Sequence, residues 1–129
     1  MFLFQFSHYF TYPEDQVTYF AFSFPFSFQE SIEQMDLIQT KLFNQPNIYF
    51  NRDVLCYSLE GRKVEIVTIS SKDGIQEEYE KTPDSDMFPE GNHCNRFVNK
   101  KVVFLTSRVH PGETPGSHVL NGFIELLTE

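Results

Sequence analysis

The chain is short of positive charge, of cysteine and of long apolar runs. It has 10 Lys and Arg against 18 Asp and Glu in 129 residues, which gives a formal net charge of −8. Nucleic acid and anionic membranes are themselves negative, so they are poor partners for so acidic a chain. No apolar run approaches the length of a membrane-spanning helix, and the N-terminus lacks the basic start of a signal peptide. We therefore expect a cytoplasmic protein that binds neither nucleic acid nor membrane.

Cysteine is nearly absent, since Cys56 and Cys94 are the only two. They form neither a C-x-x-C pair nor the spacing of a zinc finger, and His93-Cys94 side by side in a loop is a poor geometry for chelating one metal. Cys56 alternates into an expected strand, where cysteine usually behaves as a small buried apolar residue. We expect two free thiols in a reducing compartment.

Phenylalanine is abundant instead, and nine of the fifteen fall within residues 1–28. Those from Phe20 to Phe28 occupy every second position, which places them on one face of a strand. Such a stripe is typical of a core face rather than of a ligand platform. Pro25 removes a backbone donor and puts this strand at the edge or end of a sheet. A segment this short must complete a sheet formed elsewhere or pack on the rest of the chain.

A helix and a hairpin are predicted next. Ser27 and Glu30 have the spacing of a capping box, and apolar residues follow at helical intervals over 28–43. Two apolar runs, 54–59 and 63–69, are joined at Glu60-Gly61, which we interpret as a two-residue loop with glycine at its second position. This arrangement predicts two strands joined by a tight turn.

The second half of the chain predicts a loop, a strand and another helix. The acidic stretch 70–95 contains proline and glycine and few apolar residues, so we expect a long solvated loop there. The β-branched and apolar run 101–106 predicts a buried strand. Together with the helix that follows, this order of elements indicates an α/β protein with a mixed sheet flanked by helices.

A histidine and a carboxylate three residues apart follow that strand. Pro111-Gly112 between them forces a turn, and Thr114-Pro115 is typical of an N-cap and a first helical residue. His110 and Glu113 therefore belong to a strand-to-helix loop, at the kind of sheet edge where α/β proteins bind ligands. An imidazole and a carboxylate are two of the three protein ligands of a His2Glu catalytic zinc site, although the same spacing also occurs in surface pairs.

The string 106–115 around this pair resembles the first zinc motif of the cytosolic carboxypeptidases, the zinc metallocarboxypeptidase branch that trims glutamates from tubulin tails. Segment 19–28 resembles the part that joins the N-terminal β-domain of that family to its catalytic domain, and 52–65 resembles the opening strands of the catalytic domain. The resemblance implies the end of a β-sandwich-like N-terminal domain at 1–27. It implies the first part of a truncated zinc carboxypeptidase catalytic domain at 28–129.

The resemblance also implies a cofactor. One Zn²⁺ would be held by His110, Glu113 and a third histidine that lies beyond Glu129, and the general base is expected beyond Glu129 as well. No catalytic base is therefore assigned within the chain. Glu125 and Glu129 lie late in the second helix and are poor candidates for activating a zinc-bound water.

Two further residues near the loop have alternative interpretations. Arg108 is a candidate substrate-binding residue, because it is the one cation beside the metal loop, and it is alternatively a structural residue of the turn. His118 lies eight positions after His110, but the second helix directs it, so we expect a helix-surface histidine and not a third ligand.

The implied function is removal of C-terminal or branch-point glutamate from polyglutamylated tubulin or another polyglutamylated protein. The cytoplasm, with microtubules and cilia as candidate places within it, is the implied location. Two alternatives stay open. The chain is a catalytically inactive truncated fragment or binding module, or it belongs to a related zinc amidohydrolase that deacylates acyl-amino acids.

Overall fold

Two helices and two antiparallel strand pairs make up the structure, a computed structural model that describes residues 3–11, 17–82, 86–91 and 93–129. Along the chain they are α1 (Phe28–Leu42), β1 (Ile48–Tyr57), β2 (Lys63–Ser71), β3 (Ile75–Tyr79), β4 (Asn95–Phe97) and α2 (Thr114–Thr128). Helices beside small antiparallel sheets are consistent with the predicted α/β class and with a partial zinc carboxypeptidase fold.

Helix α1 begins at the predicted capping box. The Glu30 backbone N–H donates to Ser27 Oγ at 3.1 Å, and the Ser27 backbone N–H donates to Glu30 Oε2 at 2.6 Å. These two bonds satisfy donors that a helix start otherwise leaves open. The predicted helix over 28–43 is confirmed, with its end one residue earlier than expected.

Strands β1 and β2 form an antiparallel hairpin in which Ile48 pairs with Ser71 and Tyr57 with Lys63. Two expectations about this hairpin were wrong. Its first strand starts at Ile48 rather than at residue 54, because pairing with β2 carries the ladder through a polar stretch that the apolar pattern excluded. The turn spans five residues, 58–62, and is closed by the Ser58 N–H donating to the Arg62 carbonyl at 2.8 Å.

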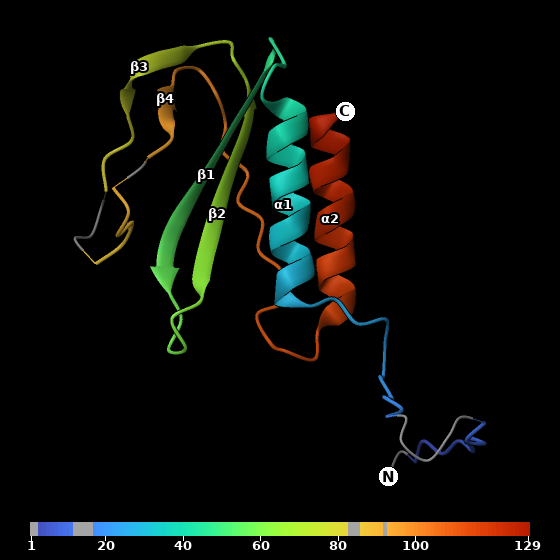
Figure 1. Cartoon of the computed structure of the whole chain (residues 1–129). Coiled ribbons are helices and arrows are strands. Elements are labelled where there is room, and N and C mark those ends of the chain that lie inside the picture. The colour runs from blue at the N-terminus through green and yellow to red at the C-terminus, as the bar shows by residue number, and fades with distance from the viewer. Residues whose placement is uncertain (1–2, 12–16, 83–85, 92) are drawn as a thin grey trace.

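The core lies on both sides of α1, which stands between the hairpin and α2 in Figure 1. Three α1 residues are buried there: Met35, Ile38 and Leu42. The hairpin packs on them with Ile48, Phe50 and Val67, and α2 packs on them with Ile124. The helices run in the same direction, because both begin at the lower end of the view and end at the upper end (Figure 1).

Helix α2 leaves most of its apolar side chains exposed. Val119, Phe123, Leu126 and Leu127 have between 47% and 69% of their surface open. The helix instead buries two polar residues, Ser117 and Thr128. These lie about two turns before and about one turn after Ile124, so all three share the side of α2 that faces the core.

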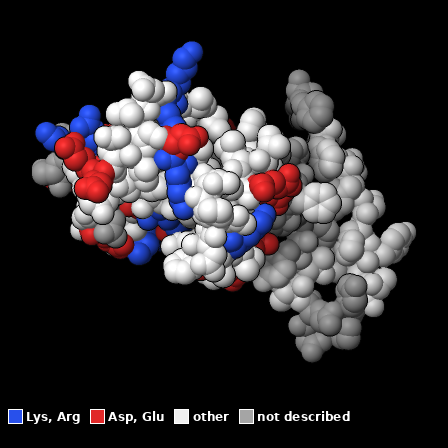
Figure 2. All heavy atoms as spheres, turned by 90° about the horizontal axis from the view of Figure 1, so that it is seen from above, with Lys and Arg blue, Asp and Glu red and all other residues white. Residues whose placement is uncertain are grey.

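The acidic excess does not collect into one patch on the face shown in Figure 2, where Lys and Arg side chains lie beside Asp and Glu side chains. The structure contains several ion pairs, among them Lys63 with Glu90 at 2.9 Å and Arg62 with Glu60 at 3.1 Å. Pairing of this kind lowers the local field of the −8 chain.

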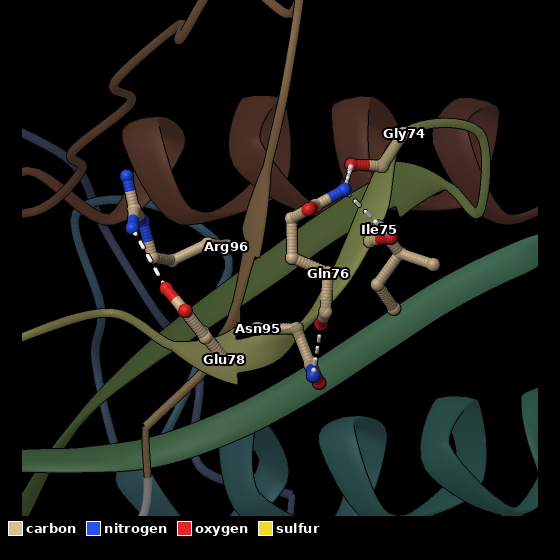
Figure 3. A network of polar contacts seen from close by, with 6 residues as sticks. All are labelled: Gly74, Ile75, Gln76, Glu78, Asn95 and Arg96. Atoms are coloured by element: carbon tan, nitrogen blue, oxygen red, sulfur yellow. Dashed lines mark hydrogen bonds and ion pairs between the residues drawn. The ribbon is translucent and has the colours of Figure 1, made fainter.

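Strands β3 and β4 form a ribbon inside the stretch that we expected to be a loop. Tyr79 pairs with Asn95, and side chains bridge the two strands (Figure 3). Asn95 Nδ2 donates to the Gln76 carbonyl at 2.8 Å, and Arg96 Nη1 lies 3.0 Å from Glu78 Oε2. The loop prediction over 70–95 was wrong for residues 70–71, 75–79 and 95, which belong to β2, β3 and β4. β3 is exposed throughout, and its acidic composition resembles that of a solvated loop.

Two predicted strands are not formed. Residues 101–106 are coil and pair with no described strand, and Val102 is 91% exposed. The Phe stripe of 20–28 likewise has no strand among its described residues, and Phe22 is 96% exposed. A strand requires a hydrogen-bonded neighbour as well as a suitable sequence, and neither segment pairs with a described strand. The proposed domain division at 1–27 and 28–129 stays a prediction.

Candidate metal centre

The loop before α2 is a tight turn centred on Pro111-Gly112. The Glu113 N–H donates to the His110 carbonyl at 3.0 Å, and the Gly116 N–H donates to the Glu113 carbonyl at 3.0 Å. Proline suits the second position of such a turn because its φ is already fixed there. Helix α2 starts at Thr114 with Glu113 as its N-cap, so the expectation that Thr114 is the N-cap was wrong by one residue. Pro115 is consequently the second helical residue, one position later in the helix than expected, and still lies in its first turn.

The turn brings the two predicted zinc ligands into contact. His110 Nδ1 lies 2.6 Å from Glu113 Oε1, and the His110 backbone N–H donates to Glu113 Oε2 at 3.4 Å. Both side chains are open to solvent, with exposed fractions of 76% and 53%. An imidazole nitrogen and a carboxylate oxygen that share a proton are the donor types that zinc takes, and the ion would replace that proton. The pair therefore fits two positions of a zinc site.

Among the residues that the structure describes, no third His, Cys, Asp or Glu joins this pair to complete a metal-binding group. His118 lies on the surface of α2, with Nε2 3.5 Å from the Phe24 carbonyl and its ring 5.5 Å from that of Phe26. Glu125 is exposed further along the helix, and Glu129 follows its last turn. The expectation that none of the three takes part in the site stays a prediction.

Arg108 holds the loop through hydrogen bonds to two backbone carbonyls. Its Nε and Nη2 donate to the Pro111 carbonyl at 3.3 and 3.2 Å, and its Nη1 donates to the Phe26 carbonyl. Its backbone has φ +55°, in the left-handed region that non-glycine residues rarely adopt. Ser107 Oγ would stand only 2.9 Å from a Cβ placed on Gly116, so the residue before Arg108 packs directly on the start of α2.

A charge cluster between α1 and the hairpin was not predicted from the sequence. Arg52 is 11% exposed and lies 2.5 Å from Asp36 Oδ1 and 2.8 Å from Glu65 Oε2. Burial opposes the charge of Arg52, but hydrogen bonds with the Glu65 and Asp36 carboxylates outweigh this effect and raise its pKa. Adjacent charges inside a strand were the available signal, because charged residues are rarely buried without partners.

Asp53 is buried on the other side of β1. It is 4% exposed, and its Oδ1 has no hydrogen-bond partner among the described residues. Burial raises the pKa of the Asp53 carboxyl. Hydrogen bonds from the Asn51 amide, which donates to Oδ2 at 2.6 Å, and from the Cys94 backbone offset part of that rise.

Comparison with known proteins identifies the family to which this chain belongs. Residues 23–129 match the zinc carboxypeptidase family, so the chain belongs to that family of metallocarboxypeptidases. It is 41% identical over 138 residues to cytosolic carboxypeptidase-like protein 5 of Bos taurus, an alignment that covers 98% of this chain and 15% of the relative. It is 39% identical over 122 residues to the Danio rerio protein of the same name, covering 85% of this chain and 14% of that protein.

Cytosolic carboxypeptidase 1 of Homo sapiens is also similar, with 37% identity over 115 residues that cover 88% of this chain and 8% of the relative. The predicted resemblance to the cytosolic carboxypeptidases is confirmed. The chain spans about 15% of the length of the first of these relatives. Within the described residues, each helix falls short of the length and apolar character that a bilayer crossing requires.

Proposed function

We propose that the protein containing this chain is a zinc carboxypeptidase that removes glutamate from the C-terminus or branch point of polyglutamylated proteins, tubulin being the leading candidate. The observation that carries the proposal is the contact between His110 Nδ1 and Glu113 Oε1 at 2.6 Å, in a chain of the zinc carboxypeptidase family. The names of the relatives support a cytoplasmic location, at microtubules or cilia if tubulin is the substrate.

In this proposal His110 and Glu113 hold Zn²⁺ together with a third histidine outside residues 1–129. The bound ion would lower the pKa of a water to about 7 and polarise the scissile carbonyl. Glu113 serves as a ligand and not as the general base, because one carboxylate cannot easily do both. The base and the cationic groups that recognise a glutamate side chain are proposed to lie outside this segment as well.

Substitution of each ligand in the full-length protein tests the metal site. His110→Ala and Glu113→Ala should each abolish zinc retention after dialysis and stop release of glutamate from a polyglutamylated peptide. Glu125→Ala is the matched control, because that carboxylate is exposed on α2 outside the turn and should leave both readouts unchanged. Undiminished zinc content in either ligand variant would overturn the site assignment.

Substrate class is tested separately with the wild-type protein. Three peptides are compared, which end in linear glutamate, branched glutamate or an aliphatic residue. One of the two glutamate peptides should be cleaved fastest. Hydrolysis confined to aliphatic ends would retain the peptidase and overturn the glutamate preference. Hydrolysis of acyl-amino acids alone would favour the deacylase. A folded protein that binds no zinc and cleaves nothing would favour the binding module.

A further inference from the structure

Each of the three guanidinium nitrogens of Arg108 donates a hydrogen bond to a backbone carbonyl of the protein. Its Nε and Nη2 form the two-pronged edge that suits a carboxylate, and both prongs close on the Pro111 carbonyl, at 3.3 and 3.2 Å. Nη1 donates to the Phe26 carbonyl, 82 residues away in sequence. One side chain therefore fastens the middle of the metal turn to the segment that leads into α1.

The position of the accepting carbonyl matters because Pro111 stands between the two metal ligands. Fixing the Pro111 carbonyl fixes the orientation of the turn from which His110 and Glu113 project. Both side chains are largely exposed, so packing does little to hold them. The turn is held by its backbone hydrogen bonds, by the contacts between His110 and Glu113 and by the hydrogen bonds of Arg108.

The backbone of Arg108 supports the same conclusion. A non-glycine residue persists at φ +55° only where its surroundings over-determine it, and such residues gather at functional sites. The surroundings here are three hydrogen bonds from the Arg108 guanidinium and the close packing of Ser107 on Gly116.

We propose that Arg108 is a positioning residue that preorganises the zinc ligands His110 and Glu113 by binding the Pro111 and Phe26 carbonyls, and does not itself bind substrate. This inference rests on the proposed function. A metal bound by a preformed turn spends less of its binding free energy on ordering the ligands, so loss of the guanidinium weakens metal binding.

Two variants of the full-length protein test it. Arg108→Gly removes the guanidinium while tolerating φ +55°, so the backbone can keep its conformation. Arg108→Lys keeps the charge, but an ammonium cannot reproduce the two-pronged contact. Arg96→Ala is the matched control, since Arg96 is an exposed arginine that pairs with Glu78 on the β3–β4 ribbon.

Zinc affinity is measured by competition with a chromophoric chelator, and the visible spectrum of the Co²⁺-substituted protein reports the coordination geometry. Both Arg108 variants should bind zinc about 10- to 100-fold more weakly, with an altered cobalt spectrum. Low-millimolar guanidinium should restore part of the affinity of Arg108→Gly. Arg96→Ala should match the wild type in each measurement.

Unchanged zinc affinity and cobalt spectrum with a raised KM would show that Arg108 binds substrate, and would overturn the inference. Unchanged values throughout would overturn it as well. The wild type and His110→Ala are run in parallel. If these two bind zinc equally, the proposed metal site has failed. If His110→Ala loses zinc but Arg108→Gly binds zinc as tightly as the wild type, the metal site stands and the role of Arg108 is refuted.

Discussion

Arg52 Nη1 on β1 lies 2.5 Å from Asp36 Oδ1 on α1, and this ion pair joins the hairpin to the helix that packs on it. The same guanidinium lies 2.8 Å from Glu65 on β2. The two carboxylates differ in surroundings, because the Asp36 side chain is 63% exposed whereas that of Glu65 is 16% exposed.

Arg52→Ala and Asp36→Ala should therefore lower the free energy of unfolding by unequal amounts. Arg52→Ala leaves the partly buried Glu65 carboxylate without its partner and should lower the free energy of unfolding by about 2 kcal/mol. Asp36→Ala removes a partner that water already screens and should cost less than about 1 kcal/mol. Chemical denaturation of both variants checks the ranking, and equal losses would contradict the burial argument.

Gly74 and Gly61 form a matched pair for testing backbone crowding. Both have φ +72°, but a Cβ on Gly74 would stand 2.6 Å from the Val98 carbonyl oxygen, whereas nothing lies within 4 Å of one on Gly61. Gly61→Ala should cost about 1 kcal/mol for the left-handed backbone alone. Gly74→Ala should cost about 3 kcal/mol, because the Val98 carbonyl must move as well. Thermal unfolding of the two variants measures the difference, and similar midpoints would mean that Val98 yields easily.

Asp53 gives a prediction with a definite pH dependence. Burial raises its pKa in the folded protein above the ordinary value of 3.8, so the folded state binds a proton more readily than the unfolded state. The ionised carboxyl consequently lowers stability at neutral pH, and this penalty disappears as the pH falls below the unfolded value.

Asp53→Asn should therefore raise the urea midpoint at neutral pH, and the gain should shrink towards zero near about pH 3. Asp73→Asn is the control, because Asp73 is exposed and hydrogen-bonds with Ser71 at 3.1 Å. A gain in Asp53→Asn of the same size at both pH values would contradict the titration argument.

Features encoded over a few residues could be predicted from the sequence. The capping box of Ser27 and Glu30 and the turn between His110 and Glu113 each depend on side chains three positions apart, so spacing alone specifies the contact. Family resemblance added the chemistry, because the same turn spacing occurs in many surface loops.

Features that depend on distant partners could not be predicted. Tyr79 pairs with Asn95 across 16 residues, and the acidic side chains around Tyr79 gave no sign of that pairing. The run 101–106 has the composition of a strand, but its pairing is decided by whichever strands stand beside it, which its own residues do not encode. The hydrogen bond from Arg108 to the Phe26 carbonyl joins residues 82 positions apart, and it could not be predicted from the sequence either.

The common direction of α1 and α2 has an electrostatic consequence. Both helices begin at the end of the molecule where Glu113 lies, so the positive ends of their backbone dipoles point the same way (Figure 1). Each dipole stabilises a nearby anion by about 0.3–1 kcal/mol, most strongly within the first turn. A chain of net charge −8 therefore keeps one region in which negative charge is stabilised, and the metal turn lies in that region.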